Sequence, residues 1–302
     1  MKKLTILTIA AGLALGASAT DYTWTGAEDN YWTNKNNWAG NAVPASGANN
    51  RVIFNTPGAV YVRNDGMPSI PATVIVQQGN VVWGGAYPYT SHGLSGATPL
   101  VFDIRDDATL LASNRLERGK CMNVTKIGGG TLKLTRPCGA DSGQEPLGTF
   151  EVKEGEVAYQ GDANWIFYCT NLVVRKDAVF NCTKNNGIRT KTGTKAKPCL
   201  VTVEKGGTLK VAHANAIPTG SEIRLGDGML DMNNFAIPSG CTVKIADPAA
   251  YAARSNTVTV AKNLTAPVTV ENVDELPPNW YVEQSNGNLN LVFSIGTCII
   301  IR

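Results

Sequence analysis

A repeat of 22 residues limits what this chain can fold into more than any other feature. Its unit has two apolar positions, i and i+2, a polar or glycine turn, and two further apolar positions near i+8 and i+10. The units start at residues 52, 74, 102, 124, 150, 172, 201 and 223, and a ninth is expected at 243. A constant period with occasional insertions is typical of a protein built by stacking one structural unit.

Stacking of these units predicts an all-β fold. Alternation of apolar and polar residues turns one side of each strand inward, and a single unit cannot bury that side alone. We therefore expect a parallel β-helix (solenoid) of about nine coils of about 22 residues, with an N-terminal cap and a short C-terminal hairpin or cap. The alternative is one or two β-sandwiches, but their turns recur every 8–12 residues or so and keep no such period.

The N-terminus has the order of features found in a secretory signal. Lys2 and Lys3 precede an apolar run from Leu4 to Leu15, and Ala17–Ala19 supplies small residues for cleavage before Thr20. The apolar run is shorter than the roughly 20 residues that a membrane-spanning helix needs. We therefore expect an exported protein, secreted or at the cell surface, with no transmembrane segment in the mature chain.

The chain divides by pattern into four regions. We expect a signal peptide over residues 1–19, an aromatic-rich N-terminal cap over 20–50, the solenoid over 51–262 and capping strands over 263–302. Loss of Lys2 and Lys3 changes the formal charge from +3 to +1. A nearly neutral chain has no strong field for nucleic acid, so we expect no nucleic-acid partner.

The repeat predicts where the cysteines lie in the cross-section of the solenoid. The seven are Cys121, Cys138, Cys169, Cys182, Cys199, Cys241 and Cys298. Cys121, Cys169, Cys199 and Cys241 lie two or three positions before a repeat start, so we expect them near one corner of the cross-section. Cys169 and Cys199 belong to adjacent coils and are close enough for a disulfide. A ladder of buried thiols is the alternative. With two histidines in the chain and no Cys-x-x-Cys pair, we expect no metal site and no cofactor.

Two short motifs carry a resemblance to a known family. The segment Lys126-Ile-Gly-Gly-Gly-Thr-Leu-Lys-Leu-Thr135 resembles the autotransporter-associated β-strand repeat, and Gly206–Val211 is a partial second copy. The stretch Trp24–Trp32, followed by Asn37-Trp38 and Val52–Phe54, is similar to the opening of secreted proteins that carry this repeat. The resemblance implies a right-handed, passenger-like β-helix exposed outside the cell.

The C-terminal part departs from that family. After residue 223 too little chain remains for the membrane domain that such passengers carry. Gly287–Phe293 and the following apolar tail predict a final hairpin or capping strand. We expect the protein to be released or to be held at a surface by partners.

Catalytic motifs are sparse. The chain has no Gly-x-Ser-x-Gly, His-Glu-x-x-His or Walker motif, and its histidines are His92 and His213. A polysaccharide lyase or glycoside hydrolase is the enzyme alternative, since these need carboxylates and a cation at fixed positions. Asp103, Arg105 and Asp106 form the one compact cluster of this kind on a repeat unit, although a solvated strand face and turn also explains them.

Aromatic residues are the stronger indication of binding. Tyr22, Trp24, Tyr31, Trp32 and Trp38 precede the first repeat, while Trp83, Tyr87, Tyr89 and His92 occupy an insertion in one coil. Planar aromatic rings suit sugar rings or protein partners. The first group also suits a cap over the open end of the core.

We therefore expect a secreted or cell-surface β-solenoid with a structural and adhesin-like binding role and without catalysis. Its partner would be an extracellular glycan or a surface protein. The candidate ligand-binding residues are Trp24, Trp32, Trp38, Trp83, Tyr87, Tyr89 and His92.

Overall fold

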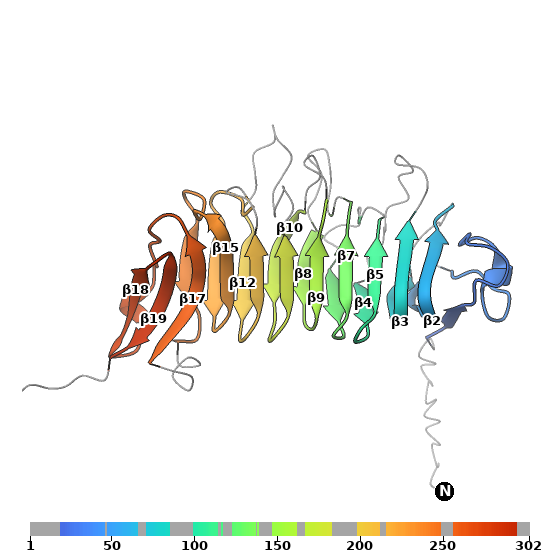
Figure 1. Ribbon diagram of the computed structural model, residues 1–302, viewed down its shortest axis with the longest axis horizontal. Helices are drawn as coiled ribbons and strands as arrows, with labels where there is room; N and C mark the ends of the chain where they lie inside the picture. Colours follow the sequence, from blue (N-terminus) through green and yellow to red (C-terminus); the bar gives the residue numbers. More distant parts are fainter. Residues whose placement is uncertain are drawn as a thin grey trace, which may run out of the picture.

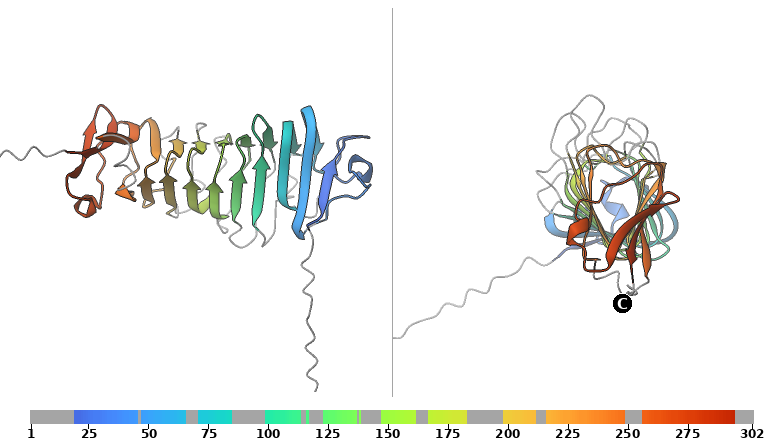
Figure 2. Two further views of the ribbon diagram at one scale, coloured as in Figure 1. Left: turned by 90° about the horizontal axis from the view of Figure 1, so that it is seen from below. Right: turned by 90° about the vertical axis from the view of Figure 1, so that its left-hand side faces the viewer.

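The protein is an elongated stack of β-strands (Figures 1 and 2). The computed structural model describes residues 19–45, 47–65, 71–84, 99–113, 116, 123–136, 138, 147–161, 167–182, 198–211, 216–248 and 256–294. These residues form one large, mostly parallel sheet of 19 strands. The all-β prediction is therefore confirmed, and the arrangement is consistent with a β-solenoid. The predicted signal peptide lies almost entirely outside the described residues.

Successive strands belong alternately to two parallel ladders. Two long strands, β2 (Gly47–Arg63) and β3 (Pro71–Gly84), contribute to both. The first ladder continues through β4 (Leu100–Ile104), β6 (Val124–Ile127), β8 (Leu147–Val152), β10 (Cys169–Val174), β12 (Leu200–Glu204), β14 (Glu222–Gly226) and β16 (Thr242–Ile245). The second continues through β5 (Thr109–Ala112), β7 (Thr131–Leu134), β9 (Glu156–Tyr159), β11 (Val179–Cys182), β13 (Thr208–Val211), β15 (Met229–Phe235) and β17 (Thr257–Leu264).

The predicted repeat starts face one another across the first ladder. Val52 pairs with Val74, Leu172 with Val201, and Ile223 with Val243. The exception is β6, where Lys126 rather than Val124 lies opposite Phe102. The second ladder keeps its register at this point, with Leu110 opposite Leu132. The glycine turn after β6 thus shortens the path between the two ladders by two residues relative to the preceding coil.

One apolar core runs the whole length of the stack. Alternate residues of each strand point inward, and Phe102, Phe150 and Phe180 are fully buried. Phe167 packs edge-on against Phe150 and Phe180, with ring centroids 4.8 and 5.0 Å apart. Each buried side chain of this size contributes roughly 1.5–3 kcal/mol of transfer free energy. Packing of these buried rings between neighbouring coils therefore contributes to the stability of the fold.

A third, shorter line of pairing lies between the ends of the second ladder and the starts of the first. Leu116 pairs in parallel with Cys138, and Cys138 with Phe167. All three side chains are buried. The coils in the middle of the stack therefore present a third side to the same core.

The two edges of the stack are built differently. The turns from the first ladder to the second are short, at residues 105–108, 128–130, 153–155, 175–178, 205–207 and 227–228. We call this side the tight-turn edge, and it follows the lower edge of the stack in Figure 1. The connections back to the first ladder are long and variable, at 85–99, 113–123, 135–146, 160–168, 183–199 and 212–221. We call this side the loop edge.

The described passages from the first ladder to the second each contain a left-handed residue at the tight-turn edge. These residues are Gly58, Gly79, Asp107, Gly128, Gly155, Asp177, Gly206, Asp227 and Asp247, all with positive φ. Glycine adopts this conformation without steric penalty, and aspartate is one of the few other residues that tolerate it. At Gly155 the neighbouring coil adds a second constraint, because a Cβ atom would lie 2.5 Å from the carbonyl oxygen of Gly130.

Both ends of the stack are closed. At the N-terminal end β1 (Asp21–Trp24) pairs in parallel with β2 and is followed by a 3-10 helix, η1 (Lys35–Asn37). At the other end β17 pairs antiparallel with β19 (Asn288–Phe293), which forms a hairpin with β18 (Trp280–Ser285). The hairpin predicted near Gly287–Phe293 is therefore present. A second 3-10 helix, η3 (Val273–Glu275), precedes this hairpin.

Candidate functional site

The predicted acidic and basic cluster lies at the tight-turn edge, where β4 ends. Arg105 Nη2 is 3.0 Å from Asp103 Oδ2, in an ion pair whose carboxylate side is largely buried. Asp106 packs over the next coil, since its Oδ1 is 2.1 Å from the place that a Cβ on Gly129 would occupy. The structure thus brings Asp103, Arg105 and Asp106 together, and it adds Lys126 and Glu154 from the next two turns.

Lys126 is the group in this cluster that the sequence pattern did not identify as functional. Its inward position puts the whole side chain out of contact with solvent. The Nζ atom donates hydrogen bonds to the carbonyl oxygens of Gly128 and Glu154, the second at 3.0 Å. Burial lowers the pKa of Lys126 to about 8, although the carboxylates of Glu154, Asp103 and Asp106 oppose this shift.

The glycine turn next to Lys126 is closed by its own neighbours. Gly128 N donates a hydrogen bond of 2.9 Å to Glu154 Oε2, and Gly130 N donates to the carbonyl oxygen of Ile104. A Cβ atom on Gly128 would lie 2.2 Å from that same carbonyl oxygen, so only glycine fits. The lysine amine and the carboxylate therefore satisfy backbone groups of adjacent coils.

This arrangement decides what the cluster can do chemically. A lysine with a lowered pKa is a potential base or nucleophile. Such a role needs contact with a substrate, and Lys126 is completely shielded. The cluster therefore joins three turns together, and the Lys-x-Gly-Gly-Gly pattern was the sequence signal that could have indicated this.

The four tryptophans expected to bind a ligand are buried. Trp24, Trp32, Trp38 and Trp83 are each at most 4% exposed. Trp38 lies edge-on to Trp24 and Trp32, with ring centroids 4.9 and 4.8 Å away, and Trp32 stacks on Trp83 at 5.5 Å. A ligand at the surface cannot reach these rings. Their burial favours the alternative expectation, in which these rings cover the end of the solenoid core.

The polar framework of this cap is organised by Asn37. Its side-chain oxygen accepts hydrogen bonds from the backbone N–H groups of Glu28 and Asp29, and its Nδ2 donates to Tyr31 O. Trp38 Nε1 donates to Trp32 O at 2.8 Å. These bonds fix the chain so that the indole rings point into the core.

The remaining aromatic candidates, Tyr87, Tyr89 and His92, lie outside the described residues, as does His213. Both flanks of the 85–99 connection are described, in β3 and β4. Its binding role stays a prediction.

The cysteines partly follow the predicted corner. Cys169 and Cys199 face each other inside the stack, with their sulfur atoms 3.9 Å apart. Cys241 lies further along the same side and donates its S–H to Pro218 O at 3.2 Å. Cys121 and Cys298 fall outside the described residues.

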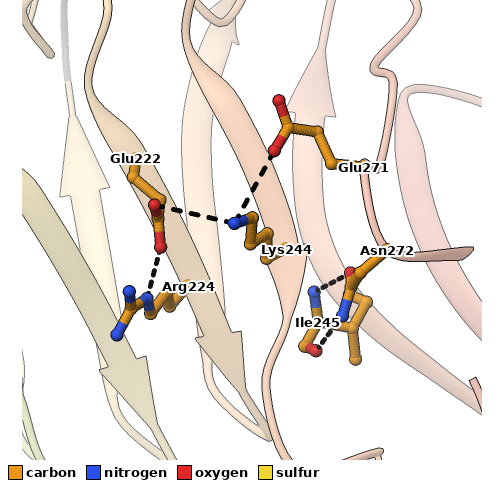
Figure 3. Close-up of polar contacts among 6 residues, drawn as sticks. All are labelled: Glu222, Arg224, Lys244, Ile245, Glu271 and Asn272. Carbon is orange, nitrogen blue, oxygen red and sulfur yellow. Dashed lines mark hydrogen bonds and ion pairs between the residues drawn. The ribbon is translucent and has the colours of Figure 1, made fainter. Parts of the chain in front are cut away.

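The outer side of the first ladder carries charges of alternating sign. Near the C-terminal end Glu222 pairs with Arg224 and, at 3.8 Å, with Lys244, which also lies 3.8 Å from Glu271 (Figure 3). The hydrogen bond from Arg224 holds the pKa of Glu222 below its usual value. Neighbouring coils thus neutralise each other's charges and leave no field of one sign on this stretch.

No helix in the described part of the chain is long and apolar enough to cross a membrane. Within the same residues, no three His, Cys, Asp or Glu side chains are grouped so that they could hold a metal ion. Comparison with protein-family models, curated proteins and solved structures found no match to this chain.

Proposed function

We propose that this protein is an exported, passenger-like β-solenoid that acts outside the cell as a rigid scaffold for binding, in an adhesin-like role. The observation that carries the proposal is the difference between its two edges. One edge has short turns that each contain a left-handed residue, while the other returns the chain through long connections of unequal length. Long loops on a rigid frame are where binding residues concentrate in proteins of this kind.

The finer description of the scaffold belongs to the same proposal. We take the chain to be a right-handed parallel β-helix of about nine coils, in which β2 and β3 begin the series and β16 and β17 end it. The pairing of repeat starts between adjacent coils supports this, and so does the third line of pairing through Leu116, Cys138 and Phe167. A stack of nine coils at about 4.8 Å each would be roughly 40 Å long.

The expected ligand is a glycan or another surface protein, and the 85–99 connection is the proposed contact. It contains Tyr87, Tyr89 and His92, which together offer apolar rings with polar groups at their ends. Because the four neighbouring tryptophans are used in the core, this connection holds the rest of the aromatic candidates.

The enzyme alternative has weaker support. A lyase or glycosidase needs a carboxylate that can reach its substrate. Asp103 is 8% exposed and ion-paired with Arg105, and both lie at the tight-turn edge rather than the loop edge. Their geometry suits a structural ion pair within one coil.

A glycan array probed with the full-length mature chain tests the binding role. We expect binding that is lost when the 85–99 connection is replaced by a short Gly-Ser linker. The matched control is the same replacement of 183–197, within another connection of the loop edge, which should leave binding intact. Equal effects of both replacements, or no binding to any glycan or surface protein, would argue against the proposal.

Assays for reducing sugars and for unsaturated products, run on the same sample, test the alternative. Turnover that is abolished by Asp103→Asn or Asp106→Asn would overturn the proposed role. Export is tested separately by expressing the whole chain and sequencing the N-terminus of the protein found outside the cytoplasm, which should begin at Thr20.

A further inference from the structure

Two cysteines of adjacent coils meet inside the stack. The sulfur atoms of Cys169, at the start of β10, and Cys199, just before β12, are 3.9 Å apart. Both side chains are buried, at 0% and 2% exposure, and both are thiols in this structure. They are 30 residues apart in the sequence, and the chain between them comprises the rest of β10, β11 and the long connection of the loop edge at 183–199.

The backbone around the pair is already in place for a cross-link. β10 and β12 pair in parallel with Asn171 opposite Leu200, so Cys199 lies one residue further along its strand than the partner of Cys169. One strand spacing combined with one residue step separates the two Cα atoms by about 6 Å, which is the usual distance in a disulfide. Ser221 Oγ fixes Cys199 further by accepting a hydrogen bond of 3.0 Å from its N–H.

The other described cysteines on this side are less well placed. Cys241 lies two strand spacings from Cys199, because Ser221, just before β14, lies between them. Ser221 accepts hydrogen bonds from Cys199 N and from Thr242 N. Two strand spacings are about 10 Å, beyond the roughly 7 Å limit for a disulfide. The Cys138 sulfur lies 3.6 Å from Arg136 O. The sulfur–sulfur contact of 3.9 Å therefore favours Cys169 and Cys199 as the pair.

We propose that Cys169 and Cys199 form an oxidative modification site, where a small disulfide oxidant such as glutathione disulfide converts the two thiols into one inter-coil disulfide. One thiolate attacks the oxidant and releases one glutathione thiol, leaving a mixed disulfide. The second thiolate then displaces the other glutathione thiol. The protein loses two electrons and two protons, and the oxidant gains them.

Burial determines when this reaction occurs. The thiolate is the attacking species, and burial raises the pKa of the Cys169 thiol well above its usual value. Exchange in the folded protein is therefore slow, and the bond forms while the coils are assembling. Once formed, it is shielded from reductants in the same way. It joins the two coils that flank the 183–199 connection, so that connection can vary while its two ends stay fixed.

Folding of the full chain with and without glutathione disulfide, followed by alkylation in denaturant and intact-mass analysis, tests the site. We expect the oxidised protein to take up two fewer alkyl groups and to give a linked peptide containing Cys169 and Cys199. Its melting temperature should be several degrees higher than that of the reduced protein, since a cross-link over a loop of this length stabilises the fold. Dithiothreitol should reduce it slowly without denaturant and rapidly with it.

Matched variants separate this pair from the other cysteines. Cys169→Ala and Cys199→Ala should each abolish the loss of alkylation, whereas Cys241→Ala should keep it. If an alanine variant fails to fold, the linked peptide from the wild-type chain decides the question alone. Full alkylation of the oxidised wild type, or a linked peptide containing different cysteines, would overturn the proposal. A link that left the melting temperature unchanged or lower would also contradict it.

Discussion

At the scale of single residues, the stack contains one buried amine where its pattern calls for an apolar side chain. Lys126 occupies an inward position of β6 and donates hydrogen bonds to two carbonyl oxygens, one of its own turn and one of the next. Hydrogen bonds of a charged donor are worth more than neutral ones, but removal of the amine from water opposes this gain. The lowered pKa shows that loss of solvation is the larger effect.

The stability of the protein should therefore rise with pH above about 8. In the folded state Lys126 loses its proton near pH 8, whereas in the unfolded chain it keeps the proton up to about its ordinary value of 10.5. The unfolded chain thus binds more protons in this window, and the free energy of unfolding increases with pH by up to about 3 kcal/mol.

Urea denaturation at several pH values between about 8 and 10.5 measures this contribution, with Lys126→Met as the reference variant. Other groups also titrate there, so the informative quantity is the difference between the two proteins. Wild type should gain stability relative to Lys126→Met as pH rises. Parallel pH profiles would show that Lys126 has an ordinary pKa.

The left-handed turn residues offer a second test at this scale. Gly155 and Gly58 both have positive φ, of 65° and 86°. A Cβ at Gly155 would strike the carbonyl oxygen of Gly130, whereas a Cβ at Gly58 has nothing within 4 Å. Gly58→Ala should destabilise the protein by about 1–2 kcal/mol for the backbone conformation alone. Gly155→Ala should cost about 1–3 kcal/mol more because of the clash. Chemical denaturation measures both, and equal losses would contradict the packing argument.

At the scale of strands and ladders, a side chain takes the place of a further strand beside β16, the last strand of the first ladder. Asn272 Oδ1 accepts a hydrogen bond of 3.0 Å from Ile245 N, and Asn272 Nδ2 donates one of 2.8 Å to Ile245 O (Figure 3). Val270 pairs with Val243 next to it. The amide thus takes the two backbone bonds that another strand would make. Edge strands without such protection tend to pair with further chains.

Replacement of Asn272 should loosen this end and expose it to association. We expect Asn272→Ala to lower the free energy of unfolding by about 1–3 kcal/mol, because two bonds to Ile245 are lost. Asn272→Asp keeps the acceptor and loses the donor, so its effect should be intermediate. Denaturation gives the stability, and sedimentation velocity gives the association state. A fully stable, monomeric Asn272→Ala protein would show that this amide does not protect the edge.

The sequence pattern predicted the ladders better than it predicted their ends. The repeat starts depend on apolar alternation, which burial enforces, so their pairing follows wherever the turn length is constant. It fails at β6 because three glycines allow a shorter turn, and a spacing rule cannot detect that. The tryptophans near residues 24–38 were ambiguous for a different reason: an aromatic ring looks the same in a sequence whether it covers a core or contacts a ligand. The Asn37 hydrogen bonds and the bond from Trp38 Nε1 to Trp32 O hold these rings toward the core, and a sequence pattern does not show such bonds.

At the scale of the whole molecule, the strands contact chiefly their neighbours in the stack. β10, for example, pairs with β8 and β12. Proteins of this kind behave as a chain of linked units whose stability is the sum of local terms. A destabilising substitution at one end of the stack should therefore lower the stability chiefly of the strands near that end.

Hydrogen exchange with a variant of the N-terminal cap tests this local behaviour. Trp32→Ala removes a buried ring that stacks on Trp83 of β3. Such a change costs about 3–5 kcal/mol where the site cannot collapse. We expect faster amide exchange in β2 and β3 and unchanged exchange in β12 to β16. Equal acceleration in all strands would indicate one cooperative unit.

The contrast between the two edges also sets how the molecule can change over generations. Lengthening a flexible connection is inexpensive, at roughly 0.6 kcal/mol for each doubling of its length. The turns of the tight-turn edge are instead only two to four residues long, and each keeps a left-handed residue and leaves the apolar side of the next strand facing inward. Length therefore varies little along one line of the molecule and widely along the opposite one, so new sequence accumulates on a single side of an unchanged frame.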